Sequence, residues 1–284
     1  MKIPTKETSK KIEYLAQQFR LEVFDLLHDK GTGHWGGSSS VADILTYLYF
    51  ERMNIRPEEP DWPNRDRLIL SKGHASPMLY TVMAHRGYFD VEEVKKFRDI
   101  DSRMQGHPCM NTTPGVEMST GALGHGISVG LGMALASKLM ENNFYIYVIV
   151  GEGCLNEGES WEGIMAAAKF KPEKLVLIVD YNMVQLDGRA EDIMPLDPLY
   201  EKFTSFGWRV GEKIYDGHNS DSIRSAFEWV DSKSAGPSVI VCRTIKGKGV
   251  SFMEDTHEWH GATIDDETYV KARPELTAGL HQWR

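Results

Sequence analysis

The chain has 284 residues, a formal net charge of −9 and 41% hydrophobic residues, values typical of a globular protein that can bury a large core. The negative charge argues against nucleic acid or an anionic membrane as a partner. The N-terminus lacks the apolar core of a signal peptide, and no run approaches the roughly 18 apolar residues of a membrane span. Three widely spaced cysteines indicate reduced thiols and predict a cytoplasmic protein.

The first part of the chain predicts helices separated by a glycine-rich segment and a loop. From about residue 6 to residue 28, apolar residues recur along one helical face. Residues 31–40, GTGHWGGSSS, predict a break whose serines can cap a helix at 41–53. A proline-rich loop then leads to a short strand at 66–70, and a further helix is expected from Gly73 onward.

The later segments predict the remaining layers of an α/β protein. Residues 103–121 are rich in loop-forming residues, and the helix expected at 123–141 carries glycines that favour close packing. Helices are also expected at 196–206 and 220–232, followed by an apolar strand at 238–244. Since no linker or repeat divides the chain, we predict one domain of all 284 residues, an α/β three-layer sandwich with a mostly parallel sheet.

The most informative segment, residues 145–188, predicts one βαβ unit. An apolar strand ends in GEG at 151–153, an amphipathic helix follows, and a second apolar strand ends in DYN at 180–182. Ligands of parallel sheets bind beyond the carboxyl ends of the strands, where both turns lie. The Glu152 carboxylate and the Asn182 amide oxygen can therefore hold Mg²⁺ or Ca²⁺ together, while the glycines and the helix N-terminus suit a diphosphate.

Histidines in loops of small residues are further candidates for chemistry. Five of the ten histidines lie in or near such loops, namely His34, His74, His107, His257 and His260. Imidazole can bind phosphate or hydroxyl oxygens and can move protons, although a single loop histidine is more often exposed and without a function. The segment TIKGKG at 244–249 is a candidate anion-binding loop, and it is equally compatible with a strand exit that carries solvated lysines.

Six segments, in this order, resemble the N-terminal, diphosphate-binding part of the transketolase family. They are GHWGGS, SKGHASPMLY, GHP, GALGHGI, GEG followed by N, and THEWHGA. The resemblance runs from about Gly33 to Ala262, and the ordered set is far more specific than any one segment. It implies a thiamine diphosphate-binding fold, with thiamine diphosphate and Mg²⁺ (or Ca²⁺) as cofactors. It also implies transfer of a two-carbon ketol unit from a ketose or its phosphate to an aldose or its phosphate.

The resemblance further implies roles for individual positions. The expected metal ligands are Glu152, Asn182 and the carbonyl oxygen of Val184. The expected cofactor contacts are His74, Gly121, Ala122, Leu123, Gly153, Asn182 and His257. The residues expected to meet sugar hydroxyls and assist proton transfer are His34, His107 and His257. Glu152 departs from the family, which has an aspartate there, so the extra methylene bears on metal affinity and metal preference. His125 stands where glutamine is frequent.

The resemblance covers only part of a complete transketolase. The pyrimidine-binding and C-terminal domains are therefore expected on a partner chain, which would supply the activating glutamate and the groups that hold a sugar phosphate. We expect the N-terminal subunit of a split transketolase, inactive alone, with two copies of each subunit. The alternatives are a 2-oxo acid dehydrogenase component, an enzyme like deoxyxylulose phosphate synthase, or a non-catalytic cofactor-binding or scaffold protein.

Overall fold

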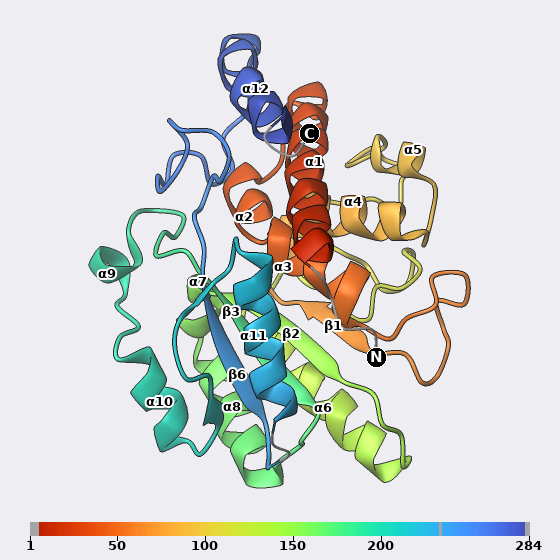
Figure 1. The fold of residues 1–284 in the computed structure, drawn as a ribbon, viewed down its shortest axis with the longest axis vertical. Helices are drawn as coiled ribbons and strands as arrows, with labels where there is room; N and C mark the ends of the chain where they lie inside the picture. Colours follow the sequence, from red (N-terminus) through yellow and green to blue (C-terminus); the bar gives the residue numbers. More distant parts are fainter. Residues whose placement is uncertain (1–5, 233–234, 282–284) are drawn as a thin grey trace.

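A parallel sheet lies at the centre of the protein in the computed structural model, which describes residues 6–232 and 235–281 (Figure 1). Its strands are β1 (Arg67–Leu70), β2 (Ile146–Gly151), β3 (Leu175–Tyr181), β4 (Arg209–Val210), β5 (Tyr215–Asp216) and β6 (Ser238–Arg243). Hydrogen-bonded neighbours follow the order β1, β2, β3, β6 and β4, and β5 also pairs with β6. All of these pairs are parallel, so the chain must cross over between paired strands, mostly through helices.

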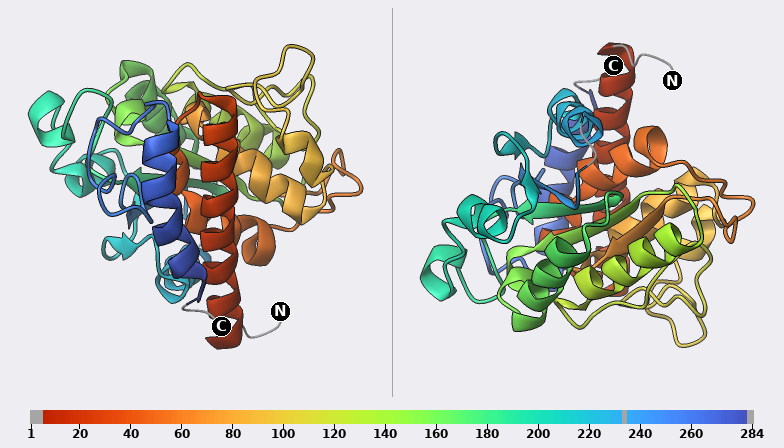
Figure 2. Two further views of the ribbon diagram at one scale, coloured as in Figure 1. Left: turned by 90° about the horizontal axis from the view of Figure 1, so that it is seen from above. Right: turned by 90° about the horizontal axis from the view of Figure 1, so that it is seen from below.

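One face of the sheet packs against helices from both ends of the sequence. They are α1 (Lys6–Lys30), α3 (Ala42–Tyr47), a π-helical turn (Leu48–Arg52), α4 (Ser76–Arg86) and α11 (Ser220–Asp231). Helix α12 (Asp266–His281) lies side by side with α1, as the left view in Figure 2 shows. The hydroxyl of Tyr269 fixes this pair by donating a hydrogen bond to Asp25 Oδ1 over 2.8 Å. None of the helices in the described residues is both long and apolar enough to cross a membrane.

The opposite face packs against a second set of helices. They are α6 (His125–Leu139), α8 (Gly158–Phe170) and α10 (Leu199–Ser205). Successive side chains of a strand point to opposite faces, so Tyr147 and Ile149 enter the first hydrophobic core whereas Val148 and Val150 enter the second. The two cores on either side of one sheet confirm the predicted three-layer α/β sandwich, and burial on both faces explains the continuous apolar runs of β2 and β3.

Helix α6 approaches the sheet closely because two of its glycines face β2 and the residue that follows β1. A Cβ atom on Gly130 would lie 2.6 Å from Cγ2 of Val148, and one on Gly126 would lie 2.6 Å from Cβ of Ser71. These contacts leave no room for a side chain at either position. The predicted close packing of this glycine-rich helix is therefore confirmed.

The register of the sheet brings four chain segments together at one edge. Gly151 at the end of β2 pairs with Asp180 in β3, and Asp180 pairs with Cys242 in β6. On the other side, Leu70 at the end of β1 pairs with Ile149. The segments that follow β1, β2, β3 and β6 therefore all leave the sheet at its carboxyl edge, where ligands of such sheets bind.

Several expectations about local structure were wrong. Residues expected to form a break are helical, because α2 spans Trp35–Ser40, and its serines do not cap the next helix. Instead, the buried hydroxyl of Ser39 donates to the carbonyl oxygen of Gly36. The elements that were not predicted are α5 (Val91–Val94), α7 (Glu152–Leu155), α9 (Ala190–Ile193), α12, β4 and β5. Apart from α12 these are too short to show a hydrophobic period.

Candidate active site

A cavity of about 180 Å³ opens at the carboxyl edge of the sheet. It is lined by Gly37, Lys72, His74, Leu123, Gly151, Glu152, Gly153, Cys154, Asn182, Val184, Gln185, Leu186, Lys246 and His260. A larger hollow of about 530 Å³ lies between α1, α4 and α5, but its charged lining is mainly acidic and would repel an anion. The smaller cavity is the candidate site, because the segments that follow β1, β2, β3 and β6 all contribute residues to its lining.

The three expected metal ligands lie together in this cavity. Glu152, Asn182 and Val184 are all buried. The Met183 amide donates a hydrogen bond to Glu152 Oε1, and the Val184 amide donates to Asn182 Oδ1 over 3.1 Å. Burial raises the pKa of Glu152 to about 7, with nearby Asp180 adding to the effect and the Met183 amide opposing it. A cation would stabilise this carboxylate in its charged form.

The donor set fits a hard divalent cation. It offers a carboxylate, a side-chain amide oxygen and a backbone carbonyl oxygen, which are the ligands that Mg²⁺ and Ca²⁺ take. Within residues 6–232 and 235–281, no cluster of three His, Cys, Asp or Glu side chains is arranged to hold a metal. The mixed oxygen set of Glu152, Asn182 and Val184 is not a cluster of that kind.

A buried ion pair forms the floor of the site. Lys72, in the SKGH segment after β1, pairs with Asp180 and donates to the Gly37 carbonyl oxygen over 2.9 Å. Asp180 also accepts hydrogen bonds from the hydroxyls of Ser40, at 2.7 Å, and Thr244. Burial would raise the pKa of Asp180, but Lys72 and the two hydroxyls lower it overall. In the DYN turn, Asp180 therefore has a structural role as the partner of Lys72, whereas Asn182 lines the cavity.

Three histidines gather beside the cavity. The ring centroids of His34, His74 and His260 are 5.0 to 5.4 Å apart. Burial, together with neighbouring positive groups, lowers the pKa of His34 to about 4 and the pKa of His260 to about 3. Burial also lowers the pKa of His74 well below its usual value. These rings are therefore neutral at pH 7 and can accept a hydrogen bond.

His107 lies at the exposed side of the site. A Cβ atom on Gly121 would be 3.1 Å from the His107 ring, and Gly121 has a φ of +143°, which favours glycine. Burial and the charge of Arg98 lower the pKa of His107. The charge of His107 is among the lesser causes that lower the pKa of His34. The structure therefore brings these two predicted sugar-binding histidines to one place.

The other predicted cofactor contacts divide into two groups. Leu123 and Gly153 line the cavity, as expected of residues that touch a bound molecule. Gly121 and Ala122 precede Leu123 in the loop before α6 and are not among the lining residues. The helix expected from Glu157 begins at Gly158, with Glu157 as its N-cap, and the short helix α7, which was not predicted, lies between Gly151 and this helix.

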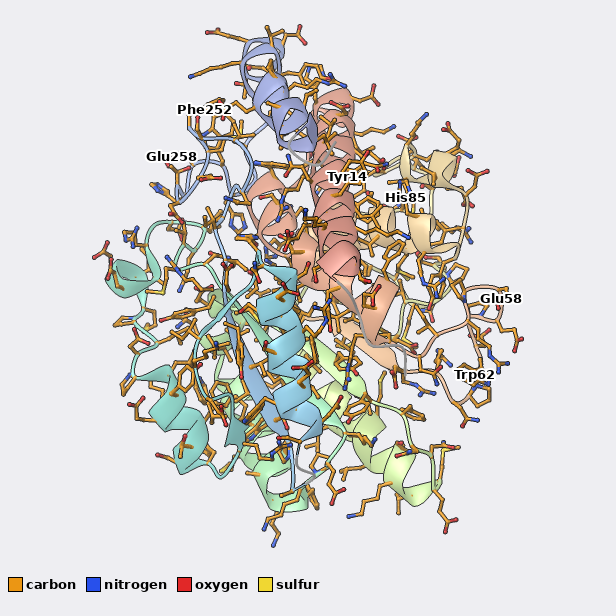
Figure 3. The ribbon with its side chains drawn as sticks, viewed as in Figure 1. Tyr14, Glu58, Trp62, His85, Phe252 and Glu258 are labelled. Carbon is orange, nitrogen blue, oxygen red and sulfur yellow. The ribbon has the colours of Figure 1, made fainter. Side chains whose placement is uncertain are left out.

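The structure places His260, and not His257, in the histidine group. The side chain of His257 is 45% exposed, and its Nδ1 lies 3.4 Å from Oε2 of Glu258. Figure 3 labels Glu258 on the outer part of the loop between β6 and α12. The segment THEWHGA holds both histidines, and its sequence does not distinguish them. The deciding contact is Gly261, where a Cβ atom would lie 3.1 Å from the His34 ring.

Lys246 is a site residue that the sequence analysis noted only as part of TIKGKG. Its Nζ donates hydrogen bonds to the carbonyl oxygens of Val184, at 3.1 Å, and Gln185, at 2.6 Å. It also donates to Nδ1 of His260 over 2.7 Å. Burial and the charge of Lys72 lower the pKa of Lys246 to about 7. The position of TIKGKG directly after a parallel strand was the available signal.

The glycine pair in GHWGGS allows these side chains to approach. A Cβ atom on Gly37 would lie 2.9 Å from Nε2 of His74, and one on Gly36 would lie 2.9 Å from Cγ of Lys246. The absence of side chains at Gly36 and Gly37 therefore lets α2 pack closely against the residues of the cavity. This packing explains why a helical segment contains two adjacent glycines.

Comparison with known proteins agrees with this geometry. Residues 12–281 match the family described as transketolase, thiamine diphosphate binding domain. The chain belongs to the transketolase family. It is 40% identical over 265 residues to the 6-deoxy-6-sulfo-D-fructose transketolase subunit SqwG of Clostridium sp. (strain MSTE9), covering 93% of this chain and 96% of the relative. It is 35% identical to an apulose-4-phosphate transketolase subunit of Phocaeicola vulgatus, covering 95% of each.

Solved transketolases are longer chains, and one part of each has the same fold as this protein. The transketolase from Leishmania mexicana superposes with a TM-score of 0.85 at 27% identity, over 96% of this chain and 45% of that one. The transketolase from Campylobacter jejuni gives the same TM-score at 29% identity, again over 45% of its length. This chain thus spans less than half of these transketolases. The predicted family, fold class and function as an N-terminal, thiamine diphosphate-dependent transketolase subunit are confirmed.

Proposed function

We propose that this chain binds thiamine diphosphate with Mg²⁺ or Ca²⁺ and, joined by a partner subunit, transfers a two-carbon ketol unit from a ketose to an aldose. The observation that carries the proposal is the convergence of Glu152, Asn182 and the Val184 carbonyl on one cavity beside His74. A cation bound by these oxygens would neutralise a diphosphate, and Gly153 leaves room for it. When bound, thiamine diphosphate supplies the carbon nucleophile and accepts the electron pair released by carbon–carbon cleavage.

The histidines supply substrate contacts and proton transfer. His34 and His260 have pKa values of about 4 and 3, lowered chiefly by burial, so both rings are neutral acceptors at pH 7. His34 carries a buried Nδ1 without a hydrogen-bond partner among the described residues, which a sugar hydroxyl can satisfy. His107 lies at the exposed side, where a sugar enters. Their role is to orient hydroxyl groups and to move protons at substrate oxygens.

The names of two relatives support a partner subunit and a sugar substrate. The two relatives described above are named as subunits of transketolases for a sulfonated fructose and for apulose 4-phosphate. We infer a sugar or sugar phosphate donor and a partner with pyrimidine-binding and C-terminal domains, two copies of each subunit forming the enzyme. The chain itself acts as a single domain. Its three unpaired cysteines suit the cytoplasm.

The test is purification of the native complex followed by an assay of ketol transfer. Proteins that co-purify in stoichiometric amounts are identified by mass spectrometry, and the reconstituted pair is supplied with thiamine diphosphate, Mg²⁺ and a panel of ketoses and aldoses. We expect aldose-dependent transfer only when both subunits are present. Pyruvate decarboxylation by the same pair would favour the 2-oxo acid or deoxyxylulose phosphate alternatives. Cofactor binding without turnover for any donor would favour the non-catalytic alternative.

A further inference from the structure

Arg98 has an unusual backbone conformation close to the two histidines expected to meet the sugar. It lies in the turn that follows α5 and is half-buried. Its φ of +62° is a left-handed conformation that is uncommon for residues other than glycine. Its amide donates a hydrogen bond to the carbonyl oxygen of Met104 over 2.8 Å. Such conformations persist where surrounding contacts hold them, and they gather at functional sites.

The guanidinium group of Arg98 lies between two loops of the site. Its Nη1 donates a hydrogen bond to Oγ1 of Thr32, two residues before His34. A Cβ atom on Gly106 would lie 2.8 Å from Nε and 3.2 Å from Cζ of Arg98, so the guanidinium packs directly on the residue before His107. One side chain therefore contacts both of the segments that carry these histidines.

Arg98 has no carboxylate partner in the part of the chain that the structure describes. Its neighbour Asp99 pairs instead with Lys30, with 2.9 Å between Oδ1 and Nζ. Burial is the main cause that lowers the pKa of His34 and of His107, and the charge of Arg98 is the next cause for both. A positive charge that acts on both rings shows that Arg98 is near each of them.

The GHP loop is also held from the side of α4. The hydroxyl of Ser76 donates to the Gly106 carbonyl oxygen over 2.8 Å, and the hydroxyl of Tyr80 donates to the Gln105 carbonyl oxygen over 2.9 Å. Neither contact reaches the loop before α2, whereas Arg98 does. The contacts with α4 therefore fix the GHP loop on the helix, and Arg98 fixes it to the loop of His34.

We propose that Arg98 is a positioning residue, which sets His107 relative to His34 by joining the loops that carry them. This inference rests on the proposed function, since it concerns the two histidines expected to orient sugar hydroxyls. Arg98 does not line the cavity, so it acts through the histidines. Precise placement matters in such sites, because a displacement of about 1 Å can lower a rate by roughly 100-fold.

Two other roles for Arg98 predict different results. A purely structural arginine would lower the free energy of unfolding when it is removed, and it would leave the kinetics of the folded enzyme unchanged. An arginine that binds the phosphate or sulfonate of a sugar would distinguish charged from neutral ketoses. A positioning residue affects both kinds of ketose equally, and its effect depends on the hydroxyl of Thr32.

The first experiment is steady-state kinetics of the reconstituted pair with a ketose phosphate and with the matching neutral ketose. For Arg98→Met we expect kcat/KM to fall roughly 10- to 100-fold for both ketoses, with an unchanged dissociation constant for thiamine diphosphate. Arg98→Lys keeps the charge and a donor for Thr32, so it should recover part of this loss. Arg103→Met is the matched control, because Arg103 lies in the same segment and pairs with Glu93. Its kcat/KM should equal that of the wild type.

Thr32→Val tests whether Arg98 acts across the two loops. Valine keeps the branched shape of the side chain and removes the oxygen that accepts from Arg98. We expect Arg98→Met to cost much less in the Thr32→Val background than in the wild type, because the bridge is already broken there. Equal losses in the two backgrounds, a loss confined to the charged ketose, or wild-type kcat/KM in folded Arg98→Met would each overturn the proposal.

Titration of the histidines by NMR gives a readout that needs no activity. In the full chain we expect the pKa of His107 to rise in Arg98→Met, because a positive charge beside the ring is removed. It should stay near the wild-type value in Arg98→Lys and in Arg103→Met. An unchanged pKa of His107 in Arg98→Met would show that the guanidinium is not beside the ring, and it would overturn the proposal whether or not the complex is active.

A second variant covers the case in which Arg98→Met does not fold. Gly106→Ala keeps the arginine but displaces its guanidinium, because the added Cβ atom would lie 2.8 Å from Nε. It is expected to show the same loss for both ketoses, and wild-type kcat/KM in this variant would also overturn the proposal. A wild-type complex that transfers no ketol unit would instead overturn the proposed function. The titration of His107 then still decides whether Arg98 lies where the bridge requires it.

Discussion

The backbone amide of Met183 donates a hydrogen bond to Oε1 of Glu152, which joins the turn after β3 to the turn after β2. Met183 has a φ of +66°, a left-handed conformation that is uncommon for residues other than glycine. The glutamate therefore has a structural role in holding the DYN turn besides lining the cavity.

We predict that Glu152→Gln separates these two roles. The amide oxygen can still accept from Met183, and the cost of burying a carboxylate disappears, so the free energy of unfolding should stay within about 1 kcal/mol of wild type or rise. The Mg²⁺-dependent part of thiamine diphosphate affinity should fall, because a metal ligand loses its charge. Chemical denaturation and titration at several Mg²⁺ concentrations measure both quantities. Glu157→Gln, at an exposed position nearby, is the control, and equal Mg²⁺ dependence in the two variants would refute a metal at Glu152.

The two histidines of THEWHGA should differ in their effect on ketol transfer. His260→Ala is expected to lower kcat/KM by roughly 100-fold or more, in the range for lost acid–base and hydrogen-bond contacts. His257→Ala should leave kcat/KM near the wild-type value, since His257 is exposed and contacts Glu258. Steady-state kinetics of the reconstituted pair compares them directly. The reverse order of effects would restore His257 to the site in place of His260.

His107 should matter for the sugar and not for the cofactor. It lies beside Gly121 at the exposed side and does not line the cavity. We expect His107→Ala to lower ketol transfer by roughly 10- to 100-fold while the thiamine diphosphate dissociation constant stays unchanged. Titration with the cofactor and kinetics with varied ketose give the two readouts. Wild-type activity in this variant would remove His107 from the site.

The buried network around Asp43 should make stability depend on acid pH. Burial would raise the pKa of Asp43, but Arg20 and His218 lower it from 3.8 to about 2. Since the carboxylate is favoured in the folded state, its contribution is complete above about pH 4 and is lost as pH falls towards 2. The shift corresponds to about 2 kcal/mol.

Urea denaturation between pH 6 and pH 2 measures this contribution. Asp43→Asn should unfold more easily at pH 6 by about 3 kcal/mol or more, because Arg20 is left buried without its partner. Its stability should also fall less steeply than that of wild type below pH 4. Asp99→Asn, which removes a more exposed pair with Lys30, is the control and should cost at most about 1 kcal/mol. An unchanged acid slope in Asp43→Asn would contradict the assignment.

The sequence determined the elements whose patterns are local and long. Continuous apolar runs identified β2, β3 and β6, because strands buried on both faces need apolar residues at every position. The βαβ connection then places the end of β2 beside the end of β3, so the meeting of Glu152 and Asn182 followed from the chain order. The ordered motifs, taken together, identified the family.

Only the tertiary structure decided which loop residues reach the cavity. His257 and His260 are three residues apart in one loop, and the packing of Gly261 against His34 selects His260. Lys246 lies in the site because Gly36, which has no side chain, allows α2 to pack closely against it. Gly36 and Lys246 are more than 200 residues apart in the sequence. Contacts between loops depend on how helices and strands that are distant in the sequence pack together. This packing cannot be predicted from the periodicity of a single segment. The two-residue strands β4 and β5 likewise exist because β6 offers them an edge.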